Sequence, residues 1–333
     1  MLKYIAGRCL QALIVLFGIT AICFAILHLT GDPAALMLPE SAVQEDYQEI
    51  RSRMGFDRPL IEQFAQYMAN AARLDFGTSY LQHRPAMSIV LDRLPATFEL
   101  ALVAFILALF IALPVGILSA THRNTPVDYA AMSTALVGQS MPNFWLGLVL
   151  ILIFSLGLDL LPTSGRLTYG IESRATTEFY FFEGLLRLDW VLFSDALKHI
   201  LLPAMTAGLY SSARLTRLVR SSMLDVLSED YVRTARAKGL SEWVVVNVHA
   251  LKNASIPLVT MAGIELGLLL GGTVVTETVF AWPGIGLLTI QALQNDDFPI
   301  IQSAVFLLAF IFVGVNLIVD LMYAWLDPRI RYA

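Results

Sequence analysis

The side chains that most often carry out chemistry are few in this sequence, and their spacing excludes the common catalytic and metal-binding motifs. A nucleotide-binding P-loop needs Gly-Lys followed by Ser or Thr. This pattern occurs at none of the four lysines, which are Lys3, Lys198, Lys238 and Lys252. The five histidines form no His-Glu-x-x-His pair, the two cysteines are too few for a zinc cluster, and no Gly-x-Ser-x-Gly elbow is present. We therefore expect no catalytic residue, no metal site and no cofactor in the chain.

Polar residues inside long apolar runs are a second group of candidates. Glu265 and Glu277 lie in or at the end of one such run, and Ser140 and Asn143 flank Pro142 in another. Ionisable residues within a membrane are functional candidates because they are costly there, and a proline can kink a helix and expose its polar backbone. We therefore predict that these four residues line a path across the membrane. The alternative is a structural role, as a buried pair or as a kink without a binding site.

A third candidate is the polar segment 221–257, in which residues 228–239 have the features of a short helix. Ser228 is a suitable N-cap, acidic residues follow it, and basic residues precede Gly239, which suits the left-handed position after a helix end. Ser241 and Glu242 then mark the start of a second helix. The pattern therefore predicts two short helices in succession.

These short helices allow two interpretations. One is a solvated loop with well-capped helices. The other is a docking helix, because the small residues Thr234, Ala235 and Ala237 would permit the close approach of a partner. Physical reasoning alone does not identify that partner.

The elements that position these residues must be membrane helices. Apolar residues make up 57% of the 333 residues and charged residues only 15%, and the mean hydropathy is +0.67. A soluble domain has about 25% charged residues, so this chain has too little polar surface to cover itself in water. The net charge of −5 argues against a nucleic-acid partner, which would require a basic face.

About 20 mostly apolar residues are needed to cross the hydrocarbon layer as a helix. By this measure we predict an all-α polytopic membrane protein with six spans, at 9–29, 97–120, 131–157, 198–220, 258–281 and 302–325. The first is too long for a signal peptide and is expected to be retained. The fourth is the weakest, because Arg214, Arg217 and Arg220 lie inside it or at its end, on one face, from which we expect them to extend to the headgroup layer.

Six spans place both termini on one side of the membrane. The segments on that side hold more basic than acidic residues, so the positive-inside rule predicts that the N- and C-termini are cytoplasmic. Two longer segments, 30–96 and 158–197, would then lie outside. In the first, an apolar stripe after Pro59 predicts an amphipathic helix and a small folded cap. The run Trp282 to Gly286 is expected to form a tight outer turn.

The segment from Asp230 to Leu240, DYVRTARAKGL, followed by HALKNASIPLVT, resembles the coupling loop of ABC importer permeases of the dipeptide/oligopeptide/nickel class. Further matches occur along most of the chain. They are GDP at 31–33, GFDRPL at 55–60, DFGTS at 75–79, RLPATFEL at 93–100, SMPNFW at 140–145, LTRLVRSSMLDVL at 215–227, TETVFAWPGIG at 276–286 and VNLIVDLMYAWLDPRIR at 315–331. The long first outer loop is similar to that of the "B" member of the paired permeases.

This resemblance implies the type I ABC importer permease fold in a bacterial inner membrane. It also implies a division of labour, in which a second, homologous permease completes the path and two ATPase subunits bind ATP and Mg²⁺ on the inside. A periplasmic binding protein would deliver the substrate, expected to be a dipeptide or short oligopeptide, with glutathione, nickel or an opine-like compound as alternatives. The implied organisation is an N-terminal helix at 1–30, a periplasmic loop at 31–96, a permease core at 97–325 with a coupling loop at 221–257, and a tail at 326–333.

The same resemblance assigns the contact with the ATPases to the coupling segment. The implied residues are Glu229, Asp230, Tyr231, Arg233, Thr234, Ala235, Arg236, Ala237, Lys238, Gly239 and Leu240. Thr234 stands where the general Glu-Ala-Ala pattern of ABC importers has Glu, and Arg236 replaces the second Ala. A salt bridge from a glutamate to the ATPase is therefore not implied.

Two hypotheses of another class remain open. A secondary transporter could use Glu265 as a proton site, in which case uptake would persist without ATP and would depend on a proton gradient. A structural membrane scaffold would leave transport unchanged when the chain is deleted.

Overall fold

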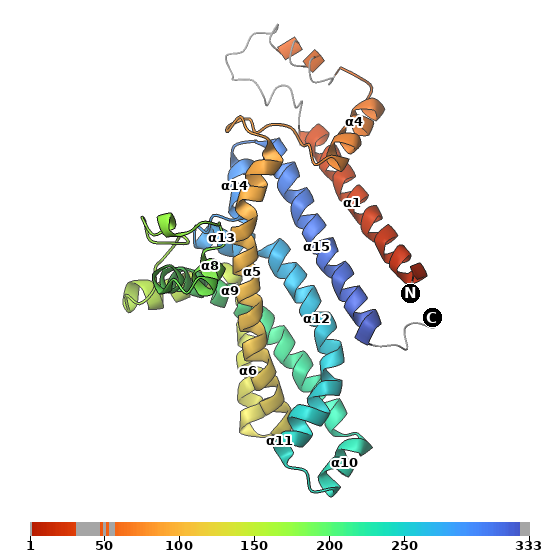
Figure 1. Cartoon of the computed structure of the whole chain (residues 1–333), viewed down its shortest axis with the longest axis vertical. Helices are drawn as coiled ribbons and strands as arrows, with labels where there is room; N and C mark the ends of the chain where they lie inside the picture. The colour runs from red at the N-terminus through yellow and green to blue at the C-terminus, as the bar shows by residue number, and fades with distance from the viewer. Residues whose placement is uncertain (1, 31–46, 49–50, 53–56, 327–333) are drawn as a thin grey trace.

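The computed structural model describes residues 2–30, 47–48, 51–52 and 57–326, and within these ranges the chain is helical without a named strand (Figure 1). The Gly-Asp-Pro run at 31–33, most of the first part of the outer loop and the tail that follows Leu326 lie outside the described residues. The all-α fold that the composition predicts is confirmed.

Three of the expected spans are single helices that are long and apolar enough to cross a membrane. They are α1 (Leu2–Thr30), α5 (Ala86–Thr121) and α15 (Phe298–Leu326). The lower ends of α1 and α15 lie side by side, where Arg8 Nε is 3.3 Å from an Asp320 carboxylate oxygen (Figure 1). The start of α1 and the end of α15 therefore lie close together, as an even number of spans requires.

Two further spans are bent. In the expected third span, α6 (Pro126–Ser140) and α7 (Asn143–Leu150), with its π-helical continuation η1 (Ile151–Gly157), meet at 104°. Pro142 cannot donate a helical hydrogen bond, so the predicted kink is a full break at Met141 and Pro142. The second bent span begins with α11 (Glu242–Val244) and the π-helical η3 (Val245–Ala250). It continues as α12 (Leu251–Gly272).

The expected fourth span is α9 (Trp190–Leu227), the longest described helix and the centre of the bundle. The Asp189 carboxylate caps its start by accepting hydrogen bonds from the Val191 and Leu192 N–H groups. Unlike the other spans, α9 has no long stretch that is both strongly apolar and nearly free of charge, and it carries the arginines noted above. It is instead enclosed by the other helices of the chain.

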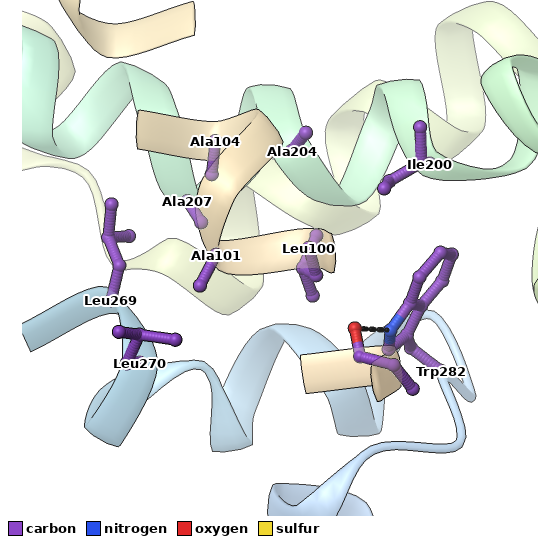
Figure 2. Close-up of a cluster of buried hydrophobic side chains, with 10 residues drawn as sticks. Leu100, Ala101, Ala104, Ile200, Ala204, Ala207, Leu269, Leu270 and Trp282 are labelled. Carbon is purple, nitrogen blue, oxygen red and sulfur yellow. Dashed lines mark hydrogen bonds between the residues drawn. The ribbon is translucent and has the colours of Figure 1, made fainter. Parts of the chain in front are cut away.

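A row of small side chains, interrupted by one leucine, lets α5 and α9 pack closely. Spacing of four places these residues in one row along α5, and each is almost fully buried. The row consists of Ala96, Leu100, Ala104, Ala108, Ala112, Gly116 and Ala120. On α9 it meets Gly208, where an added Cβ would lie 2.7 Å from the Ala104 carbonyl oxygen. Figure 2 shows the same face of α5, where Ala104 lies beside Ala204 and Ala207 of α9, with Leu269 and Leu270 of α12 on the other side.

The run from Trp282 to Gly286 forms a turn, as predicted, but this turn is mostly buried in the bundle instead of lying on the outer surface. The Trp282 side chain is among the largest fully buried groups, and its indole N–H donates to the Ala96 carbonyl oxygen at 2.9 Å (Figure 2). The run joins α13 (Val274–Val279) to α14 (Ile285–Gln294). The fifth span therefore ends at Gly272, and the chain folds back into the bundle.

The described parts of the expected outer segments pack on the bundle. In the first, α4 (Leu60–Ala72) packs on α1, with the Phe24 and Phe64 ring centroids 5.3 Å apart. Residues 86–96 belong to α5, although we assigned them to the loop, because α5 continues beyond the apolar run through the charged turn at Asp92 and Arg93. The second segment carries η2 (Glu172–Arg174) and α8 (Tyr180–Leu186), which packs on α9.

The close approach at Gly208 gives a test of the packing. In an ordinary helix, alanine is more stable than glycine by about 0.5–1 kcal/mol. Gly208→Ala should nevertheless destabilise the protein by roughly 1–3 kcal/mol, because the new methyl group meets backbone atoms of α5 that cannot rotate away. Thermal unfolding in detergent measures the change. Gly18→Ala on α1, where a Cβ has open space within the chain, should leave the melting temperature unchanged or raise it.

Candidate functional site

The predicted docking helix is α10 (Asp230–Ala237), which lies at one end of the molecule beside α11 (Figure 1). Val232 and Ala235 face inward, at 0% and 8% exposure, and pack with Val245 of η3 and with the last turn of α9. These apolar contacts fix which side of α10 faces the protein and which side faces outward.

Two polar contacts also hold α10 in place. The Tyr231 hydroxyl accepts a hydrogen bond of 2.7 Å from Asn253 Nδ2, which connects α10 to the first turn of α12. The Arg236 guanidinium donates two hydrogen bonds to the Glu242 carboxylate, at 2.6 and 3.1 Å. The two side chains thus form an ion pair with two hydrogen bonds. The end of α10 is thereby joined to the start of α11.

The turn between these helices requires a glycine. Gly239 has φ +79°, as the sequence predicts for the residue after the helix end. The Gly239 N–H donates to the Arg236 carbonyl oxygen at 2.9 Å, and the Leu240 N–H donates to the Ala235 carbonyl oxygen at 3.4 Å. A residue with a Cβ would be strained here, because the left-handed region favours glycine.

The outward side of α10 is polar and leads into exposed apolar groups. Arg233, Thr234 and Ala237 are exposed on the helix, and Asp230 forms an exposed ion pair with Arg233 at 3.1 Å. Glu229 and Lys238 are exposed at the two ends. Beyond Gly239, Leu240 is 41% exposed and Trp243 is 69% exposed. Tryptophan is enriched at protein–protein interfaces, so the exposed Trp243 favours a contact surface here.

Two details of the predicted docking helix are wrong. Ser228 does not cap α10. It follows the end of α9, where its hydroxyl donates to the Asp225 carbonyl oxygen, and Glu229 holds the N-cap position. Ala235 does not offer a small surface to a partner, because its methyl group is packed inside the chain. The exposed small residues of the predicted set are Thr234 and Ala237.

The four residues predicted to line a path are not brought together. Glu265 lies in α12 with its carboxylate 3.2 Å from the Arg214 guanidinium of α9, and Arg214 is about one-third exposed. Ser140 and Asn143 lie on either side of the break between α6 and α7, and the Ser140 hydroxyl is bound to its own helix at Leu136. Of the four, only Glu265 forms an ion pair. This pair, Glu265 with Arg214, is the charged feature at the α9–α12 contact.

Glu277 occupies a separate, enclosed site. It lies in α13 and is fully buried, where its carboxylate accepts hydrogen bonds from the hydroxyls of Thr97 and Thr273, at 2.9 Å each. The Leu287 N–H donates to it at 3.0 Å. These contacts join α5, α13 and α14. They favour a structural role for Glu277 in this conformation over a place on the translocation path.

Sequence reasoning missed two further carboxylate–arginine pairs. Arg220 does not extend to the headgroup layer. It donates two hydrogen bonds of 2.7 Å to the Asp128 carboxylate, which links α9 to the start of α6. In the other pair, Arg166 donates to Glu99 of α5 at 2.6 Å, with the Tyr180 ring below its guanidinium. One feature of the sequence could have indicated this second pair: Glu99 is a single acidic residue within an apolar run, where a charge needs a partner.

Comparisons with known proteins agree with this architecture. Residues 112–332 match the family model "Binding-protein-dependent transport system inner membrane component", and residues 1–101 match the model of the corresponding N-terminal region. A solved structure of an inward-facing methionine ABC transporter superposes with a TM-score of 0.53 at 16% identity, covering 72% of this chain and 97% of that chain. This likeness supports the expected type I ABC importer permease fold.

Three curated relatives match nearly the whole chain. A dipeptide transport system permease protein of Alkalihalophilus pseudofirmus is 42% identical over 100% of both chains. A probable D,D-dipeptide transport system permease protein of Escherichia coli is 43% identical over 97% of this chain and 96% of its own length. A glutathione transport system permease protein of Escherichia coli is 38% identical over 100% of both chains.

The left-handed turn at Gly239 gives a test of how α10 is held. Gly239→Val should strain the turn by about 1–2 kcal/mol and separate Arg236 from Glu242, whereas Gly239→Asn should be tolerated, because Asn adopts this conformation more readily. Hydrogen–deuterium exchange over residues 230–237 measures the effect. We expect faster exchange in the valine variant alone, and equal exchange in the two variants would contradict this account of the turn.

Proposed function

The chain belongs to the family of binding-protein-dependent transport system inner membrane components, and from this premise we propose that it forms half of the translocation path for dipeptides or short oligopeptides in an ATP-driven importer. The cargo is inferred from the full-length relatives, two of which carry dipeptide transport in their names. Glutathione is the second candidate, because the relative at 38% identity is a glutathione permease. Glutathione is itself a short peptide, so both cargoes belong to one chemical class.

The observation that carries the coupling mechanism is the attachment of α10 to two bundle helices. Its inward side packs on the last turn of α9, and Tyr231 joins it to the first turn of α12. A displacement of α10 would therefore move both helices, which hold the Arg214–Glu265 pair between them. A partner that moves α10 on binding ATP could thus shift the bundle between inward-open and outward-open states.

The partners follow from what this chain lacks. It has no P-loop, so ATP and Mg²⁺ would be bound by two ATPase subunits that contact the exposed side of α10, with Leu240 and Trp243 beside it. A second, homologous permease would complete the path, and a periplasmic binding protein would deliver the cargo. The surrounding lipid would cover the remaining exposed apolar side chains.

Neither rival hypothesis is retained. A proton-coupled secondary transporter would need Glu265 to exchange protons with water, but this carboxylate is 1% exposed and paired with Arg214. A structural scaffold does not account for the match of the chain to a family of transport components.

The bacterial inner membrane is the proposed location, with both termini in the cytoplasm. The arginines of α9 and the basic residues of α10 gather at one end of the molecule, and this end would be cytoplasmic by the positive-inside rule. Arg8 lies near the start of α1 and Asp320 near the end of α15, so their pairing supports an antiparallel arrangement of the two terminal helices, with both termini on one side of the membrane.

The docking surface is tested by adding bulk to its exposed side. Thr234→Trp should reduce peptide uptake by roughly tenfold or more, because a close-packed interface does not accommodate added volume. It should also abolish co-purification of the ATPase subunits in detergent, while thermal unfolding of the permease stays unchanged. Tyr169→Trp, on the opposite outer segment, should retain the ATPases. The docking proposal fails if Thr234→Trp keeps both the bound ATPases and wild-type uptake.

Orientation is tested by thiol labelling of intact cells after Cys9 and Cys23 are replaced by Ala. Ser241→Cys should resist an impermeant maleimide until the cells are opened, whereas Tyr169→Cys should be labelled at once, because both positions are exposed but lie on opposite sides of the membrane. The opposite labelling pattern would reverse the proposed orientation and remove the docking surface from the cytoplasm.

A further inference from the structure

A cavity of about 480 Å³ lies far from α10, between the end of α1, the helix α4 and the start of α15. In Figure 1 these three elements meet at the end of the molecule opposite α10. Its volume is in the range of small-molecule sites. Neither Arg214 nor Glu265 lines it, so it is separate from the charged feature at the α9–α12 contact.

One wall of the cavity is aromatic. The Phe24 and Tyr67 rings lie 5.5 Å apart between centroids, and the Tyr67 and Phe76 rings lie 6.2 Å apart. Phe64, which contacts Phe24, also lies 6.1 Å from Phe17 further along α1. An apolar surface therefore extends from the cavity along α1, toward the middle of the membrane.

Two hydrogen-bond donors in this cavity have no partner within the part of the chain that the structure describes. They are the side-chain amide nitrogen of Gln302 and the hydroxyl of Tyr67. Gln302 is only 7% exposed, so water does not readily replace the missing partner. Burial raises the pKa of the Tyr67 phenol, so its proton remains available for donation. Buried donors of this kind are normally satisfied, which points to a ligand with acceptor oxygens.

The rim of the cavity carries both signs of charge. Arg58 supplies a cation, and Glu62 and Asp75 supply carboxylates. A ligand with one anionic group and one cationic group would complement this rim, because each charge would find an opposite charge nearby.

Exposed apolar side chains adjoin the residues that line the cavity. Leu60 and Ile61, which directly precede the lining residue Glu62 in α4, are 62% and 73% exposed, and Ile26 and Leu29, which flank the lining residues 27 and 28 in α1, are also exposed. Amphipathic helices with such residues lie at the membrane surface with their apolar side in the lipid. A ligand that enters from the bilayer would meet the aromatic wall with its apolar part and the two donors with its polar part.

We propose that this cavity binds the glycerol and headgroup of one zwitterionic phospholipid. A phosphate or ester oxygen accepts hydrogen bonds from Tyr67 and Gln302, and the headgroup ammonium lies near Glu62 and Asp75. The acyl chains extend along the apolar surface at Phe17 and Phe64. A dipeptide is also zwitterionic, but a short one lacks the apolar part that this surface fits, and α9 and α12 do not line the cavity.

The test uses the whole transporter in vesicles that contain phosphatidylethanolamine with a photoreactive diazirine near the start of one acyl chain. After irradiation, peptides from α1 and α4 are analysed for attached lipid by mass spectrometry. The double variant Tyr67→Phe with Gln302→Leu should reduce labelling of these peptides by about tenfold, because two hydrogen bonds are lost. Tyr169→Phe, at a fully exposed tyrosine, is the matched control and should label like the wild type.

Two outcomes would overturn the proposal. Equal labelling of wild type and double variant would mean that the lipid is only part of the general annulus. Loss of labelling when excess dialanine is added would identify a peptide site instead. If the double variant unfolds at a lower temperature, Tyr67→Phe alone decides the question. It removes only an oxygen that has no partner among the described residues, so the fold should persist while labelling falls about threefold or more.

Discussion

The close contact between α5 and α9 is the constraint on which the rest of the structure depends. Within a membrane, helices gain little from the hydrophobic effect when they associate, so they must approach closely enough to gain from dispersion. The small residues of α5 allow this approach over about seven turns, from Ala96 to Ala120. Trp282 and Glu277 then attach α13 and α14 to the same helix, through Ala96 and Thr97. Substitutions along this row would therefore disturb several helices together.

Buried carboxylates select the partners of this central pair. Glu99 binds Arg166 of the outer segment, Asp128 binds Arg220, and Glu265 binds Arg214, so each pair joins elements far apart in the sequence. Such pairs contribute less to net stability than their geometry suggests, because both charges lose hydration. Removing one partner is much more costly, since the other charge is left buried. Their physical effect is thus to penalise alternative arrangements of the helices.

The sequence allowed the helical fold and the turn at Gly239 to be predicted, because both depend on local patterns. Long apolar runs identify spans by length alone, and a glycine after basic residues marks a helix end. The inward position of Ala235 was missed, although Val232 and Ala235 have the spacing of a buried face. The burial of Trp282 and the pairing of Asp128 with Arg220 depend on contacts between distant segments, which periodicity does not encode. For the same reason, Glu265 and Glu277 looked equivalent in the sequence but occupy different environments.

The charges of α9 have a consequence for how this chain is made. Each arginine at the centre of a helix opposes transfer from the translocon into lipid by about 2.5–3.5 kcal/mol, so a helix of this composition gains little by entering alone. The order in which the helices are synthesised offsets part of this insertion cost. By the time α9 emerges from the ribosome, α5 and the start of α6 have already been synthesised, and they offer the small-residue row and the carboxylate of Asp128. Glu265 follows only later, so Arg214 must wait for α12 before its charge is balanced. We therefore expect membrane insertion to be cooperative between neighbouring segments, with α9 stabilised only when its partners surround it.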